Sequence, residues 1–143
     1  MIRKITFVLG IAGIIFAVFA CSASDSRLTD NKWSLSSYGE QKNQVNVLEG
    51  TEITATFDKD KSQISGSSGC NLYSASYEVK GSKLSISEIT HTEMACISPQ
   101  GVMKQEQDFL TLLAAAESFA VGDATLTITC SGERQLIFTK SEK

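Results

Sequence analysis

Apolar and polar residues alternate along most of the chain after residue 31, and this alternation restricts the fold more than any other feature. Within residues 51–58, Ile53, Ala55 and Phe57 alternate with polar side chains. Such a segment is typical of a strand with one buried and one exposed face. The same pattern recurs at residues 73–79, 84–86, 126–128 and 136–138.

The segments between these predicted strands have the composition of tight turns. Each is short and polar and contains Gly or Asp, at residues 58–60, 80–82, 121–123 and 131–133. Short turns join antiparallel neighbours, so the pattern predicts a meander or a small antiparallel barrel. We expect the first strand at residues 31–38 and a longer connection at residues 39–50.

Residues 99–117 lack this alternation. Their apolar residues recur at helical spacing, at Val102, Phe109, Leu110, Leu113 and Ala116. Ser98 is a suitable N-cap, and Pro99 suits the first helical position, where no backbone N–H is needed. We therefore predict one amphipathic helix packed against the sheet, in an α+β domain that is mostly β. The expected core consists of Trp33, Phe57, Tyr77, Leu84, Ile86, Phe109, Leu113, Leu126 and Phe138.

The N-terminal segment has the layout of an export signal. Its start is basic, residues 5–19 contain no charged residue, and Ala20 precedes Cys21. This is typical of a secretory signal peptide, and the uncharged run is shorter than the about 20 residues of a spanning helix. Residues 18–21 also resemble a bacterial lipobox, which implies cleavage after Ala20 and lipidation of Cys21. Secretion without lipid is the alternative.

The predicted organisation is a signal peptide at residues 1–20, a flexible tether at residues 21–30 and a domain at residues 31–140. The tether is predicted from its Ser, Asp and Ala content and its lack of hydrophobic periodicity. Acyl chains on Cys21 would hold the domain at a membrane. Ser22 after Cys21 favours the outer membrane if the cell is Gram-negative. We therefore expect an exported, lipid-anchored protein of the bacterial cell envelope.

Composition and charge exclude several classes of protein. With 42% apolar residues, 10 Gly and one Pro, the 143-residue chain suits one globular domain and is neither collagen-like nor low-complexity. Loss of Arg3 and Lys4 with the signal peptide would leave 11 basic and 16 acidic residues, a net charge of −5. An acidic domain without a basic stripe argues against nucleic acid as a partner.

Two motifs go beyond a generic β protein. The first is a Gly-rich run at residues 64–71, which continues through Tyr73 and Tyr77, and the second lies at residues 92–96 before the predicted helix. Together they resemble the motifs of META domains, and the resemblance extends over about residues 31–140. The motif residues are Gly66, Gly69, Cys70, Asn71, Thr92, Met94 and Cys96.

The resemblance implies a small, incompletely closed β-barrel with one helix. It also implies a family that is associated with envelope stress and novobiocin resistance, includes a heat-inducible lipoprotein and has no defined catalytic activity. A disulfide between Cys70 and Cys96 is implied too, because both belong to family motifs, and export to an oxidising compartment would allow it. Pairings that involve Cys130 stay open, although its strand position suits a small buried apolar residue.

The Gly-rich motif has a structural and a functional interpretation. Gly66 and Gly69 permit a positive φ or a close approach of two backbones, and Asn71 can stabilise a turn. We therefore expect a tight corner at this motif. The alternative is a polar nest that binds a ligand.

We recognise no motif of catalysis or of metal binding in the sequence. The cysteines after Cys21 lack the close pairs of zinc sites, and His91, the single histidine, is expected to be exposed or on an edge strand. Hydrolase and nucleotide-binding motifs are absent from the sequence. We therefore expect a protein that is not an enzyme and has no metal and no cofactor.

Three hypotheses about function remain. The first is an envelope module that contacts other envelope proteins. The second is a carrier of an apolar or acyl ligand, and an inhibitor of cell-wall hydrolases is a third hypothesis from size alone. A continuous apolar cavity would favour the carrier, whereas a close-packed interior would favour the module.

Overall fold

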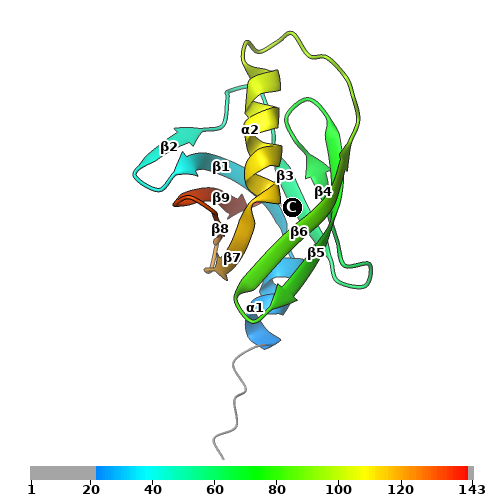
Figure 1. Cartoon of the computed structure of the whole chain (residues 1–143), viewed down its shortest axis with the longest axis vertical. Helices are drawn as coiled ribbons and strands as arrows, with labels where there is room; N and C mark the ends of the chain where they lie inside the picture. The colour runs from blue at the N-terminus through cyan, green and yellow to red at the C-terminus, as the bar shows by residue number, and fades with distance from the viewer. Residues whose placement is uncertain (1–21, 142–143) are drawn as a thin grey trace, which may run out of the picture.

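The computed structural model describes residues 22–141, so the predicted signal peptide and Cys21 lie outside the described residues. Within the described part, nine strands and two helices form the domain (Figure 1). In chain order they are α1 (Ser22–Thr29), β1 (Lys32–Glu40), β2 (Asn43–Asn46), β3 (Thr54–Asp58), β4 (Gln63–Ser67), β5 (Leu72–Lys80), β6 (Lys83–His91), α2 (Val102–Ala114), β7 (Ala116–Val121), β8 (Thr125–Cys130) and β9 (Arg134–Lys140).

Eight of the nine described strands form a closed antiparallel barrel in the order β1-β3-β4-β5-β6-β7-β8-β9. The barrel closes because β9 pairs back with β1, from Trp33↔Lys140 to Glu40↔Arg134. The prediction of a mostly β, antiparallel fold is confirmed, whereas the expectation of an incompletely closed barrel is wrong. Closure depends on pairing between strands about 100 residues apart in the chain, which a local pattern of alternation does not report.

Strand β1 is long enough to pair with two different strands along one of its edges. Its residues 32–34 pair with β3, and its residues 37–40 pair with β2. The other edge of β1 pairs with β9. Strand β2 therefore lies outside the barrel and forms a hairpin with the end of β1.

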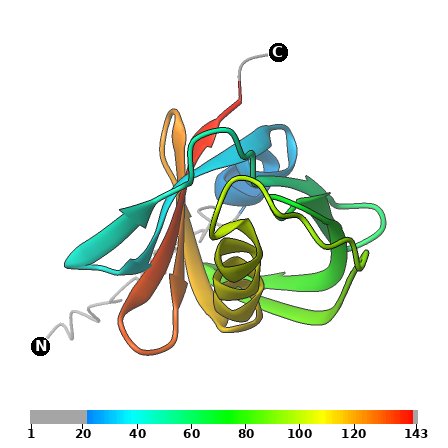
Figure 2. The ribbon, with the colours of Figure 1, turned by 90° about the horizontal axis from the view of Figure 1, so that it is seen from above.

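The β6–β7 seam is the shortest in the barrel, because these strands pair at the single register position Lys83↔Ser118. Helix α2 contacts β6 and β9. Figure 2 shows α2 nearly end-on, between the green β5–β6 hairpin and the orange-to-red strands β7–β9. The helix thus covers the side of the barrel on which β6 and β7 separate.

Helix α2 is shorter at both ends than the helix predicted for residues 99–117. It begins after Gly101, which has a left-handed φ of 91°, so Ser98 is not the N-cap and Pro99 is not the first helical residue. It ends before Ala116, which pairs with Cys130 as the start of β7. Pairing with β8 overrides the helical preference of the alanines there. Strand β7 is therefore an element that the sequence pattern does not predict.

Helix α1 occupies the segment that was expected to be a flexible tether. Leu28, near its end, is fully buried, and the Trp33 indole Nε1 donates a hydrogen bond to the Leu28 carbonyl at 3.0 Å. The tether prediction is therefore wrong for residues 22–29. The physical reason is that the buried Leu28 side chain and the hydrogen bond donated by the Trp33 indole hold this short helix against the barrel.

The interior of the barrel is filled by large side chains. All nine residues predicted for the core are buried, which confirms that prediction. Aromatic rings meet edge-on inside, Phe57 with Tyr77 at 5.1 Å and Tyr73 with Phe109 at 5.4 Å between centroids.

Candidate functional site

The two sequence motifs meet at the end of the barrel where α2 begins, which is the end opposite α1 (Figure 1). The loop between β4 and β5 supplies residues 68–71, and the segment after β6 supplies residues 92–96. Helix α2 contributes Glu106, whose carboxylate bonds to the β4–β5 loop. Segments far apart in the chain thus form one polar cluster.

Asn71 lies at the centre of this cluster and is 1% exposed. Its Nδ2 donates to Glu106 Oε1 at 2.7 Å and to the Met94 carbonyl at 3.1 Å. Its Oδ1 accepts from Thr92 Oγ1 and from the Met94 backbone N–H, both at 2.7 Å. The amide uses both donors and both lone pairs, so one side chain joins the two motifs to α2.

Glu106 supplies the negative charge of the cluster and is 4% exposed. Its Oε2 accepts from the Asn71 backbone N–H at 2.8 Å and from Ser68 Oγ at 2.5 Å. Burial raises the pKa of Glu106, but hydrogen bonds from Ser68, Asn71 and the Cys70 backbone outweigh burial and hold the pKa below its ordinary value. The carboxylate is therefore ionised at neutral pH.

In the Gly-rich loop, the backbone N–H groups of Cys70 and Asn71 form a small nest, and the anion in the nest is the Glu106 carboxylate of the same chain. Glu106 thereby uses the N–H groups that the alternative interpretation, a ligand-binding nest, would offer to a ligand. In the described structure the nest acts as a clamp between the β4–β5 loop and α2.

The two motif positions Gly66 and Gly69 require glycine for different physical reasons. A Cβ on Gly66 would lie 2.1 Å from the Thr54 carbonyl oxygen, so no other residue fits between β3 and β4 there. Gly69 has a φ of +109°, a conformation that side chains with a Cβ rarely adopt. Together these positions shape the corner that carries Cys70 and Asn71.

Sequence reasoning missed Ser68, Gln105 and Glu106. Gln105 is buried beside Glu106, and its Nε2 donates to Thr51 Oγ1 at 2.9 Å while its Oε1 accepts from the Leu48 N–H at 2.7 Å. A signal was available, because Gln105 and Glu106 lie on the same helical stripe as the buried residues Val102, Phe109, Leu112 and Leu113.

A disulfide between Cys70 and Cys96 covers this cluster, with 5.9 Å between the Cα atoms. This is the pairing that the family resemblance implies. Cys130 is the free cysteine of the described residues, and burial raises the pKa of its thiol to about 11, which keeps the thiol protonated. The bridge ties the β4–β5 loop to the segment before α2.

Removal of this disulfide is expected to lower the free energy of unfolding by about 3 kcal/mol, since the bridge spans 26 residues and restricts the unfolded chain. The measurement is urea unfolding of the wild type and of a double variant, Cys70→Ser with Cys96→Ser. As a control, dithiothreitol should destabilise the wild type and leave the double variant unchanged. Equal stabilities of the two proteins without reductant would contradict the expectation.

Exposed apolar side chains surround the disulfide. Ile97 is 95% exposed, and Leu72, Met94 and Met103 are also exposed. Met103 Sδ accepts a hydrogen bond from the Cys96 N–H at 3.4 Å, which places that side chain beside the bridge. We call these four residues the apolar end.

Within the described chain, no three His, Cys, Asp or Glu side chains are placed together to hold a metal ion. His91 is exposed, and its Nδ1 lies 2.8 Å from the Thr92 carbonyl. Neither helix of the described residues has the length and apolar content needed to cross a bilayer.

Comparisons with known proteins find a matching family and solved structures with a similar fold. The model of the META domain family matches residues 26–143. Comparison with curated proteins finds no match. A protein from Burkholderia xenovorans, solved by NMR, is 25% identical with a TM-score of 0.70, and the match covers 99% of this chain and 100% of that one. A DUF4847 family protein from Bacteroides vulgatus is 13% identical with a TM-score of 0.60 over 81% of this chain and 96% of that one, which is a likeness of fold alone.

Proposed function

The chain belongs to the META domain family, and on this premise we propose that it is a non-catalytic module of the bacterial cell envelope, exported and anchored by lipid on Cys21. We propose further that it contributes to tolerance of envelope stress or of novobiocin-type antibiotics, as its family membership suggests. Its partners would be other envelope proteins.

The apolar end is the observation that carries this proposal. Its four side chains are exposed beside a disulfide and a buried polar clamp, so the surface is held rigid although it is not covered. Exposed apolar groups that gather on one surface mark sites of protein contact. The segments that carry the apolar end, around the start of α2, lie at the end of the barrel opposite α1 (Figure 1). Because Cys21 directly precedes α1, a lipid there would leave this end facing away from the membrane.

The motif groups support a structural role instead of a catalytic one. The Asn71 amide is fully hydrogen-bonded, and the Glu106 carboxylate is committed to Ser68 and Asn71. A general acid or base needs access to a substrate and a pKa near the working pH. Glu106 is buried and its pKa is lowered, so its properties suit a clamp.

The packing of the barrel interior favours the module over a carrier that would hold its ligand inside the barrel. Trp33, Phe57, Phe109 and Phe138 are among the side chains that are fully buried in the interior. An acyl chain inside the barrel would have to displace them. Inhibition of cell-wall hydrolases stays an alternative use of the apolar end, with a hydrolase as the partner.

Replacement of Cys21 by serine is expected to abolish lipid attachment and membrane retention, because the thiol is the proposed attachment point. The wild type should fractionate with membranes, and mass spectrometry should show a diacylated Cys21 as the first residue. Complementation of a deletion strain grown with novobiocin should succeed with the wild type and fail with Cys21→Ser.

Cys130→Ala is the matched control, because it removes a thiol that is buried in the domain and should leave the protein on the membrane. An unmodified mature N-terminus, or full complementation by Cys21→Ser, would contradict the proposed anchor. Turnover of a cell-wall substrate by the purified protein would contradict the non-catalytic part of the proposal.

A further inference from the structure

Strand β6 has a free edge along most of its length. On one edge it pairs with β5, from Lys80↔Lys83 to Tyr73↔His91. On its other edge, pairing with the described strands consists of the single position Lys83↔Ser118 on β7. Residues 85–91 therefore have no strand beside them on that edge among the described residues. A strand edge of this kind pairs readily with a strand of another chain.

The hydrogen bonds of the β5–β6 hairpin show where the backbone of Ile86 points. Tyr77 lies opposite Ile86, and its N–H donates away from β6, to the Ser62 carbonyl at 2.9 Å. Two residues that face each other in an antiparallel pair either bond to each other or both point away. The N–H and C=O of Ile86 therefore point to the free edge, where an added strand would meet them.

A groove that is mostly apolar lies between β6 and α2. Its volume is about 590 Å³, and its lining includes Ile89 from β6 and Met103, Leu110 and Ala114 from α2. Figure 2 shows α2 beside the green β5–β6 hairpin, and the two elements are in contact. Side chains of a strand point alternately to its two faces, so a strand beside β6 would lay every second side chain on this wall of α2.

The groove is continuous with the apolar end, because Met103 belongs to both. The surface that we propose to contact envelope proteins therefore extends from the apolar end along β6. A partner segment could follow both without a break.

The groove and its rim carry negative charge. Glu106 lines the groove as an ionised carboxylate. Glu88 is exposed on β6, and Glu93 is exposed two residues after the end of this strand. Like charges brought together oppose binding, so an acidic occupant such as a fatty acid is disfavoured.

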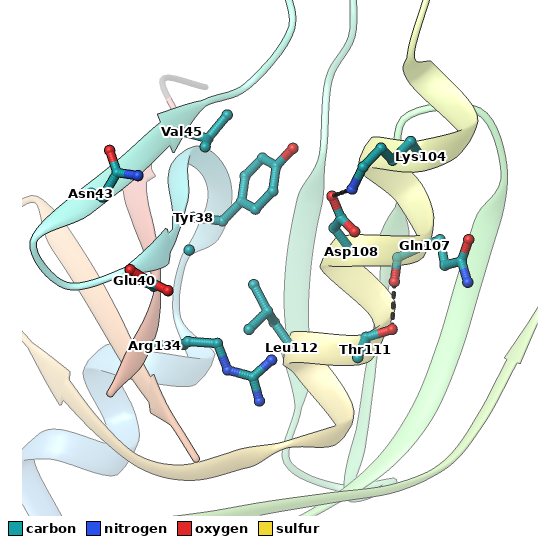
Figure 3. Close-up of a pocket in the computed structure, with 11 residues that line it drawn as sticks. Tyr38, Glu40, Asn43, Val45, Lys104, Gln107, Asp108, Thr111, Leu112 and Arg134 are labelled. Carbon is teal, nitrogen blue, oxygen red and sulfur yellow. Dashed lines mark hydrogen bonds and ion pairs between the residues drawn. The ribbon is translucent and has the colours of Figure 1, made fainter. Parts of the chain in front are cut away.

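The basic residues nearest in sequence lie away from the groove. Lys104 is the one basic residue of α2, and it lies on the other side of the helix, with its Nζ 2.6 Å from Asp108 (Figure 3). Lys83 lies at the far end of β6, where β6 pairs with β7. Between Lys83 and Lys104 the sequence contains no Lys or Arg. An occupant with basic side chains is therefore complementary in charge.

We propose that the free edge of β6 and this groove bind an extended segment of a partner protein that carries alternating apolar and basic side chains. The segment adds a strand beside residues 85–91, and its apolar side chains pack on Leu110 and Ala114. This inference rests on the proposed function in taking the partner to be another protein of the envelope.

The probe is an acetylated and amidated heptapeptide of alternating valine and lysine, titrated into the full-length ¹⁵N-labelled protein in a nonionic detergent. Saturable shifts are expected at the backbone N–H signals of Ile86 and Leu110. Exchange of the Ile86 N–H with solvent should slow about tenfold or more in the complex, because the added strand accepts its hydrogen bond. A peptide of alternating valine and glutamate should bind about tenfold more weakly or not at all.

Ala114→Lys is expected to weaken binding of the valine–lysine peptide about tenfold, because it places a like charge in the groove. Ala120→Lys is the matched control, because Ala120 is exposed on β7 outside the groove, and it should bind as the wild type does. If Ala114→Lys loses its folded spectrum, Glu93→Gln replaces it, with an expected weakening of about threefold. Unchanged affinity in the folded variant would overturn the proposal.

Two further peptides test whether the ligand adds a strand, one N-methylated on every valine and one on every lysine. Alternate N–H groups of a strand point to the same neighbour, so one of these peptides should lose binding and the other should keep it. Equal binding by both would overturn the proposal. Laurate binding in the groove in preference to the peptide would overturn it in favour of an acyl ligand, and dimerisation through residues 85–91 would overturn it in favour of a second copy.

The groove and the proposed function can fail separately. Complementation by the wild type with no binding of the valine–lysine peptide would overturn the groove proposal alone. Peptide binding with the expected variant effects, but without complementation by the wild type, would support the groove and contradict the proposed function.

Discussion

Phe109→Ala is expected to lower the free energy of unfolding by about 3–5 kcal/mol. The ring is fully buried on α2 and meets the Tyr73 ring edge-on at 5.4 Å. Its removal would leave a cavity between the helix and the barrel. The closely packed side chains around that cavity cannot move far enough to fill it. Urea unfolding followed by the fluorescence of Trp33 measures the change.

Gln107→Ala is the matched control for this prediction, because Gln107 is an exposed residue of the same helix. Its effect should stay within about 0.5 kcal/mol, as is usual for surface substitutions. A loss below about 1 kcal/mol for Phe109→Ala would show that α2 is not docked on the barrel through this face.

Asn71→Asp is expected to destabilise the protein by about 3–5 kcal/mol, although it changes the shape of the side chain very little. The Nδ2 group donates to Glu106 Oε1 at 2.7 Å. In the variant a carboxylate oxygen would take its place, so two buried carboxylates would face each other and a donor to the Met94 carbonyl would be lost.

The effect of Asn71→Asp should depend on pH with a predictable sign. Two carboxylates that share a buried site raise the pKa of one of them, so the variant takes up a proton at a higher pH than the wild type does. A protonated Asp side chain regains an O–H donor towards Glu106. The stability difference from the wild type should therefore shrink between pH 7 and pH values near 5.

Asn46→Asp provides the control for this pair of measurements, because Asn46 is exposed on β2. It should leave the free energy of unfolding nearly unchanged at both pH values. Wild-type stability of Asn71→Asp at pH 7 would show that the clamp between the motif and α2 does not stabilise the fold. A stability difference independent of pH would show that the two carboxylates do not interact.

The sequence by itself determined nine residues of the apolar core and the mostly β, antiparallel kind of fold that they form. Alternation marked Phe57, Tyr77 and Leu126 as core positions, and all three are buried. The glycines of the first motif pointed to a corner, and Gly66 and Gly69 shape one. These features are local, because the side-chain period of a strand and the backbone freedom of glycine depend on a few neighbouring residues.

Only the tertiary structure decided the partners of these elements. Closure of the barrel by β1 and β9, the end of α2 before Ala116 and the docking of α1 through Leu28 each depend on contacts across the fold. The clamp also depends on such a contact. In the sequence Glu106 is one charged residue of a helix, and only the fold brings the Asn71 Nδ2 group, 35 residues earlier, to 2.7 Å from its Oε1. The hydrophobic period of a segment predicts which of its side chains are buried, because apolar groups are more stable away from water. The partner of a buried polar group is set instead by packing between segments that are distant in the chain.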